Sequence, residues 1–105
     1  MISTRRLTPN TIGQGQNEEI AYKIDFTKWC RNGNPPTVAV VQIVDKSNNT
    51  DVTATKATGA PLITGNTITT PSIHDLGPDV QYRMNVQATI DGNVMEAWVL
   101  IVGEE

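Results

Sequence analysis

The sequence predicts an all-β domain, and three observations support this. Residues 19–27 and 80–90 alternate between apolar and polar side chains, the period-two pattern of a strand with one buried face. Turn-forming sequences such as Asp91-Gly92 separate these runs from other β-branched segments. No window combines helical periodicity with capping residues. About seven short strands spaced by turns are typical of a single sandwich or a small barrel.

Length, charge and cysteine content exclude several classes of function. The 105 residues suffice for one domain with one core, here taken as residues 1–105. A net charge of −3 argues against phosphate-backbone binding, so we expect no nucleic-acid partner. No segment approaches the roughly 20 apolar residues of a membrane helix, and the N-terminus lacks a signal-peptide run, so we expect no membrane partner and synthesis in the cytosol. Cys30 is the single cysteine, which excludes an intrachain disulfide and a cysteine metal cluster.

The N-terminal residues 1–17 are polar and are interrupted by Pro9, Gly13 and Gly15. Residues 2–8 are expected to form a short edge strand, where a following proline is tolerated. The Gly-Gln-Gly-Gln-Asn run after it is expected to be a flexible loop. Two outcomes stay open for the whole segment, which either folds back on the sheet or reaches a partner.

The first half of the chain then contributes three candidate strands. Residues 19–27 place their apolar side chains on one face (Ile20, Tyr22, Ile24 and Phe26). Residues 37–44 are β-branched and apolar on both faces, which suits a central strand. Residues 51–57 alternate weakly and predict a short edge strand.

The second half contributes the remaining strands. Residues 62–63 and 66–73 are separated by Thr-Gly-Asn, and residues 80–90 are joined to residues 94–102 by the Asp-Gly turn. In the last strand, one row is apolar throughout and is expected to face the core (Met95, Ala97, Val99 and Ile101). Trp98 is then left on the outer face, where it either covers the N-terminal segment or meets a partner.

The sequence offers little chemistry. His74 and Asp75 are the only adjacent base and carboxylate, but neighbours on an extended chain point to opposite faces, so adjacency alone forms no catalytic pair. Four oxygen-bearing side chains gather in the loop 45–51, yet their spacing does not match a calcium loop, and a polar turn needs no metal (Asp45, Asn48, Asn49 and Asp51). We expect no enzyme activity, no cofactor and no metal, with calcium in this loop left open.

The spacing Leu76-x-Pro78-x-x-x-Tyr82 resembles the start of the sixth strand of fibronectin type III and immunoglobulin-like sandwiches. There a tyrosine turns back and bonds the backbone just upstream. The resemblance implies an antiparallel sandwich with strands at residues 2–8, 19–27, 37–44, 51–56, 66–73, 80–90 and 94–102, with Tyr82 as the corner tyrosine. The alternative is that Tyr82 is only another apolar residue of its strand. No cysteine pair and no tryptophan within residues 37–44 are present, which makes an antibody-type domain unexpected.

Three short motifs are similar to a family of small structural proteins of tailed bacteriophages and prophages, some described as fibre-to-tail adaptors. They are Arg6-Leu7-Thr8-Pro9, Asp25-Phe26-Thr27-x-Trp29 and the Gly-Pro-x-x-x-Tyr sequence ending at Tyr82, and the Thr- and Val-rich run at residues 37–44 adds to the resemblance. The resemblance implies a non-enzymatic adaptor or spacer of the virion, made in the cytoplasm of a bacterial host, that binds other virion proteins or itself. The candidate contact residues are Arg5, Arg6, Trp29 and Trp98. A carbohydrate- or surface-binding adhesion module is the alternative.

Overall fold

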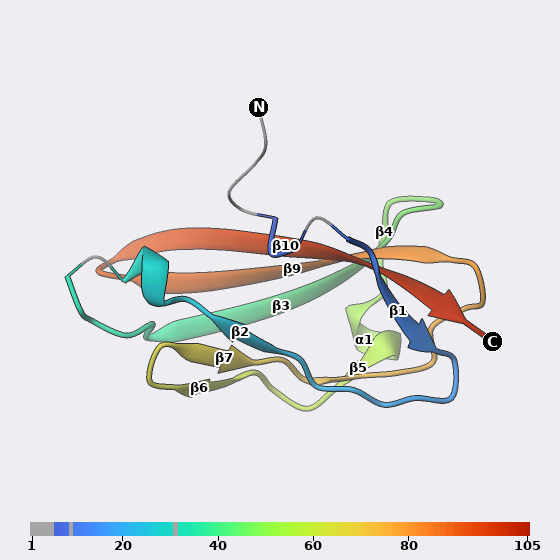
Figure 1. Cartoon of the computed structure of the whole chain (residues 1–105), viewed down its shortest axis with the longest axis horizontal. Coiled ribbons are helices and arrows are strands. Elements are labelled where there is room, and N and C mark those ends of the chain that lie inside the picture. Colours follow the sequence, from blue (N-terminus) through green and yellow to red (C-terminus); the bar gives the residue numbers. More distant parts are fainter. Residues whose placement is uncertain (1–5, 9, 31) are drawn as a thin grey trace.

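The computed structural model describes residues 6–8, 10–30 and 32–105. The chain forms two facing β-layers, with the long strands β10, β9 and β3 side by side in one of them (Figure 1). In sheet order, the larger layer consists of β1 (Ile12–Gly15), β10 (Asn93–Glu104), β9 (Gln81–Ile90), β3 (Val38–Asp45) and β4 (Thr50–Asp51). The second layer consists of β2 (Lys23–Asp25), β7 (Thr67–Thr69) and β6 (Leu62–Thr64), and β5 (Ala57–Thr58) pairs separately with β8 (Ser72–Ile73).

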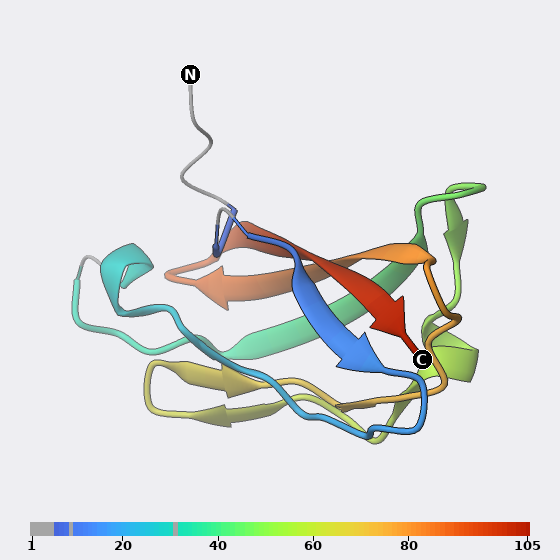
Figure 2. The same cartoon turned by 45° about the vertical axis from the view of Figure 1, so that its right-hand side comes forward.

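This strand order is that of an immunoglobulin-like sandwich, which confirms the predicted fold class. One pairing departs from the antiparallel arrangement that we expected. The first strand, β1, runs parallel to β10, with Ile12 opposite Ile101 and Gly15 opposite Glu104. Figure 2 shows β1 lying beside β10, while β2 continues in the layer below.

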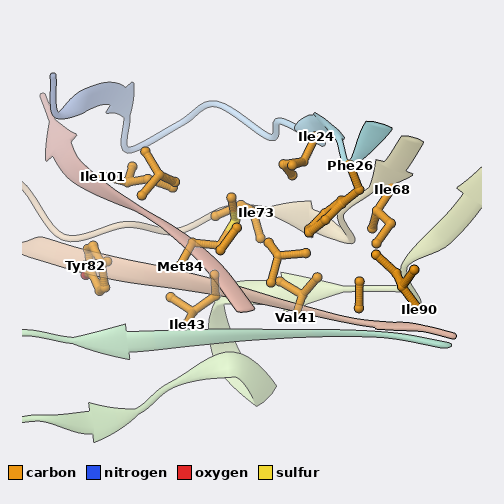
Figure 3. Packing of buried hydrophobic residues seen from close by; sticks show 14 of the residues in the cluster. Ile24, Phe26, Val41, Ile43, Ile68, Ile73, Tyr82, Met84, Ile90 and Ile101 are labelled. Carbon is orange, nitrogen blue, oxygen red and sulfur yellow. The ribbon is translucent and has the colours of Figure 1, made fainter. Parts of the chain in front are cut away.

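The core lies between the two layers (Figure 3). Ile24, Phe26 and Ile68 from the small sheet face Met84 and other buried side chains of the large sheet. The apolar rows predicted for residues 19–27 and 80–90 point inward, as does the predicted row of the last strand, in which only Met95 is partly exposed. Period-two alternation therefore identified the buried faces of three strands correctly.

The hairpin between β9 and β10 forms as expected. Asp91 and Gly92 have φ angles of 52° and 78°, the left-handed values that a type I′ turn requires. From this turn the two strands pair over ten residues each, from Asn93 opposite Ile90 to Val102 opposite Gln81. This hairpin is the longest strand pairing in the sandwich, and its outward-pointing side chains form part of the outer face of the larger sheet.

Tyr82 is the corner tyrosine. The backbone N–H of Gly77 donates to its hydroxyl oxygen at 2.8 Å, five residues upstream. Leu76 is buried beside it, and Pro78 forms an isolated parallel bridge with Gly103 on β10. The alternative, that Tyr82 is only an apolar strand residue, is thereby excluded.

The N-terminal strand begins later in the chain than the sequence predicted. The expected strand at residues 2–8 falls partly outside the described residues, and its described part makes only an isolated bridge, between Arg6 and Trp98. The actual strand is β1, within the run expected to be a loop. Its pairing is favoured by Gln14, whose fully buried side chain bonds to the opposite layer. Of the two outcomes left open, the described part of the segment folds back on the sheet, through Leu7 and β1.

Other element boundaries also differ from the predictions. After β4, residues 53–56 form one helical turn, α1 (Thr53–Lys56), instead of continuing a strand. The Asp51 carboxylate accepts bonds from the Thr53 N–H and hydroxyl, and this local turn outweighs the weak alternation. The strands expected at 19–27 and 66–73 are shorter, because η1 (Thr27–Trp29) ends the first and Thr70-Pro71 divides the second. Neither helical element in the described part of the chain is long and apolar enough to span a membrane.

Candidate functional site

One edge of β3 is open. Val52 N–H donates to the Ile43 carbonyl oxygen at 2.9 Å, and Ile43 N–H donates to Thr53 Oγ1 at 2.8 Å, so the peptide groups of Ile43 point away from β9. Because these directions alternate along a strand, the peptide groups of Ala39 and Val41 point the same way. No residue that the structure describes pairs with them, since β4 reaches only the last two residues of β3. The expectation of a central strand at residues 37–44 is therefore met only at the end of β3 that lies between β9 and β4, and not along Ala39 and Val41.

Two exposed apolar side chains lie on β3 itself, and a third lies on β10, on the other side of β9. Val38, Val40 and Val94 are 51%, 50% and 66% exposed, and they are three of the four exposed large apolar residues in the described part of the chain. Val38 and Val94 both stand opposite Thr89, one on each side of β9. The outer face of the sheet is therefore apolar at the end nearest the Asp-Gly turn. The fourth residue, Leu62, lies on β6, the edge strand of the other layer.

The open edge also lacks protection against pairing with another strand. Natural edge strands commonly carry lysine, proline or an inward charge, which discourages association. Residues 37–44 contain neither a charged residue nor a proline. The absence of charge over this run was visible in the sequence, but its meaning depended on whether the strand was central or at an edge.

Trp98 is engaged within the molecule. Leu7 N–H donates to its carbonyl oxygen at 2.8 Å, and the guanidinium carbons of Arg6 and Arg83 lie 5.1 and 4.4 Å from the centre of its ring. Arg83 Nε in turn donates to Asn85 Oδ1 at 2.7 Å. Of the two roles predicted for Trp98, the structure shows the one in which it covers the N-terminal segment.

The other predicted contact residues are only partly brought together. Arg6 and Trp29 line one groove beside β2, whereas Trp98 lies on the outer face of the large sheet. Trp29 packs on Phe26 with a ring-centre distance of 5.0 Å and is half-buried. Arg5 lies outside the described residues. The valines of the β3 edge were not among the predicted contacts.

Three aspartates share a local motif that the sequence analysis did not single out. Asp25, Asp45 and Asp51 each accept bonds at one carboxylate oxygen from the backbone N–H and the hydroxyl of the serine or threonine two residues later. The hydroxyl contributes most and the N–H next, and together they lower the pKa of each carboxyl group. Two of these aspartates are the carboxylates of the loop 45–51, so both already have partners within the chain. Among the described residues, no group of three or more acidic, histidine or cysteine side chains is placed to hold a metal.

These lowered pKa values predict the acid sensitivity of the fold. A carboxyl group whose pKa is lower in the folded state stabilises it above its unfolded pKa, and the stabilisation is lost as the pH falls through the folded pKa. We therefore expect Asp51 to titrate below its ordinary value of 3.8 in a carbon-detected NMR titration. Thr53→Val removes the hydroxyl and should move this titration upward, whereas Thr55→Val, a matched change in the same helical turn, should not. An unchanged titration in the Thr53 variant would contradict the assignment.

His74 and Asp75 do contact each other, contrary to expectation. Asp75 has a φ of 56°, which turns its carboxylate back so that Oδ2 lies 2.7 Å from His74 Nδ1. The other ring nitrogen lies 2.7 Å from Thr58 Oγ1. Although this order of hydroxyl, imidazole and carboxylate is that of a catalytic triad, Asp75 is 74% exposed at its side chain, where water weakens its hold on the imidazole. Glu18 and Glu19 line the adjoining hollow and would oppose negative charge forming on an attacked oxygen.

No family model, no curated protein and no solved structure matches the chain. The features that can support a function are therefore those of the fold itself. One of them is the open edge of β3, which suits the binding of a polypeptide strand.

Proposed function

We propose that this protein is a non-enzymatic structural protein that acts by binding other proteins, as an adaptor or spacer domain of a phage or prophage virion. The observation that carries the binding role is the open, uncharged edge of β3 with Val38 and Val40 exposed beside it. The virion setting rests on the resemblance of its sequence motifs to short phage structural proteins. The site that we assign is the β3 edge, and its partners are further copies of the chain or other virion proteins.

The β3 edge suits strand addition. Ala39 and Val41 offer two N–H donors and two carbonyl acceptors, spaced as one side of a sheet ladder. A strand that paired there would extend the five-stranded sheet and would cover Val38 and Val40. The edge is also compatible with itself, because two uncharged strands can approach in antiparallel orientation without like-charge repulsion.

The adhesion alternative has less support in the structure. Carbohydrate sites commonly need an aromatic ring free to stack against a sugar. The Trp98 ring already has two guanidinium groups over it, and Tyr22 is half-buried with its hydroxyl bonded to Gln14 at 2.6 Å. Trp29 is half-buried as well, and Lys28 Nζ lies 5.5 Å from the centre of its ring.

Light scattering after size exclusion, across a range of concentrations, tests the binding role. We expect the wild-type mass to rise with concentration, and we expect Val40→Lys to shift association to at least about tenfold higher concentration, because an edge lysine opposes strand pairing. Val94→Lys makes the same change at another exposed valine, which lies on β10 and is separated from β3 by β9, and it should have little effect. Equal effects of the two variants would contradict the β3 edge as the site.

Mass spectrometry of purified particles tests the virion setting. Phage particles induced from the strain that carries this gene should contain the protein in a fixed ratio to the other structural proteins. Abundant expression in the lysate together with absence from the particles would contradict a virion role, whatever the result for self-association.

A further inference from the structure

A second open edge lies on β2, in the smaller layer. Phe26 N–H donates to the Asn66 carbonyl oxygen and Thr70 N–H donates to the Tyr22 carbonyl oxygen, both at 2.8 Å, so these residues direct their peptide groups toward β7. By the alternation of a strand, the peptide groups of Lys23 and Asp25 point to the opposite side. No residue within the described ranges pairs with β2 on that side.

A groove of about 270 Å³ runs along this edge. One wall is formed by Leu7 and Ile12, and the other by β2 and Trp29. Met84 and Val99, which are otherwise buried in the core, also contribute to it. The groove therefore enters the sandwich between its two layers and offers an apolar surface to a side chain placed beside β2.

Next to the groove, on the same side of the sandwich, the gap between the two layers is bridged by hydrogen bonds from the Gln14 side chain. Its amide nitrogen donates to the carbonyl oxygens of Ile73 at 2.7 Å and Glu18 at 3.1 Å, and its amide oxygen accepts from the Tyr22 hydroxyl at 2.6 Å. Toward Trp29 the N-terminal segment bonds to β10 through Leu7 instead of to β2. The chain thus covers one half of this side and leaves the half at Lys23 and Asp25 without a neighbouring strand.

The charge around the groove is positive although the chain as a whole is acidic. Lys23 and Lys28 line it together with a single carboxylate, Asp25, and Arg6 also lines it, although its guanidinium lies over the Trp98 ring. Asp25 is already bonded to Thr27, and Lys23 and Lys28 form no ion pair in the described part of the chain. The first five residues of the chain contain Arg5 and no acidic residue, so their charge does not complement this groove.

We propose that the β2 groove binds an extended, acidic segment of another polypeptide as an added strand. Main-chain bonds to Lys23 and Asp25 align the segment, alternate apolar side chains enter beside Ile24 and Trp29, and the acidic side chains between them face Lys23 and Lys28. This site lies in the opposite layer from the β3 edge and does not depend on the proposed self-association. It would let one domain bind a copy of itself and a different partner at the same time.

A synthetic heptapeptide of alternating glutamate and valine, blocked at both ends, serves as the probe. We expect saturable binding by calorimetry and changes in the amide NMR signals of Lys23, Asp25 and Trp29. Lys23→Glu should weaken binding about five- to tenfold, since it replaces an attraction with a repulsion. Lys46→Glu makes the same charge change in the turn after β3, away from the groove, and should leave the affinity within about twofold.

The same peptide methylated on alternate backbone nitrogens separates strand addition from simple charge attraction. The methylated peptide keeps its charges but loses the backbone N–H groups that would bond to β2, so we expect no saturable binding. Equal binding of the methylated peptide, or equal effects of Lys23→Glu and Lys46→Glu, would overturn the proposal. Binding only to a chain that begins at Arg6, and not to the full chain, would overturn it too by showing that the first five residues occupy the groove.

Discussion

Gly103→Ala should lower the free energy of unfolding by about 3 kcal/mol, because an added methyl group has no room at this position. A Cβ on Gly103 would overlap the carbonyl oxygen of Gly77 and would lie 2.8 Å from its carbonyl carbon. Gly103 is fixed from both sides, since its N–H donates to the Val80 carbonyl oxygen at 3.0 Å and its carbonyl oxygen accepts from Asp79 N–H at 2.9 Å. The backbone of Gly77 cannot move aside as a flexible side chain would. The added methyl group must therefore push the corner at residues 76–80 away from β10.

Thermal unfolding followed by circular dichroism measures this loss, which should lower Tm by more than about 10 °C. Gly13→Ala is the matched control on the neighbouring strand, where the atoms nearest to the added Cβ belong to the flexible carboxylate of Glu104. We expect the control to change Tm by a few degrees at most. A Gly103 variant as stable as the control would show that the corner loop does not pack on β10 as closely as described.

Gln14→Ala should cost about 2–3 kcal/mol of unfolding free energy, a large effect for a residue in a short polar strand. The substitution removes three hydrogen bonds, one to Ile73 of β8, one to Glu18 in the connection between β1 and β2, and one from Tyr22, and it leaves the half-buried Tyr22 hydroxyl without its acceptor. Burial, with a smaller contribution from the nearby Glu18 carboxylate, already raises the pKa of Tyr22. The loss of an acceptor in such surroundings is not fully compensated by water.

Urea unfolding of Gln14→Ala, Tyr22→Phe and the double variant isolates the contribution of the hydrogen bond between Tyr22 and Gln14 from the other contacts that each substitution removes. We expect the two single losses to overlap, with a coupling of about 1 kcal/mol, because both remove the same bond. Gln87→Ala, an exposed glutamine on β9, is the control and should stay within about 0.5 kcal/mol of wild type. Simple additivity of the Gln14 and Tyr22 effects would contradict the bond between them.

The sequence predicted those parts of the fold in which the buried face and the local pattern agree. Alternation in residues 19–27 and 80–90, the Asp-Gly turn and the spacing to Tyr82 are local signals, and each one corresponds to the element that formed. The first strand was missed because its buried residue is Gln14, a polar side chain between two glycines. Its pairing depends on bonds to residues more than fifty positions away, which no local pattern can show.

The candidate site was harder to predict for a related reason. Residues 37–44 are apolar on both faces, and this pattern is shared by a central strand and by an edge strand that is covered on assembly. The difference is set by the turn between Asp51 and Thr53 that leads into α1, which ends pairing of β4 with β3 after two residues. Similarly, Asp75 reaches His74 only because its backbone adopts a positive φ, which the residue types alone do not require.

Hydrogen exchange at the amides of Ala39 and Val41, measured at several protein concentrations, tests most directly whether the β3 edge is the site of association. Both amides point away from β9 and should exchange rapidly in the dilute monomer. We expect their exchange to slow at least about tenfold at concentrations at which light scattering shows association, while the amide of Gln42, already bonded to β9, stays protected throughout. Association without any change at Ala39 and Val41 would contradict the account and would place the interface on another surface.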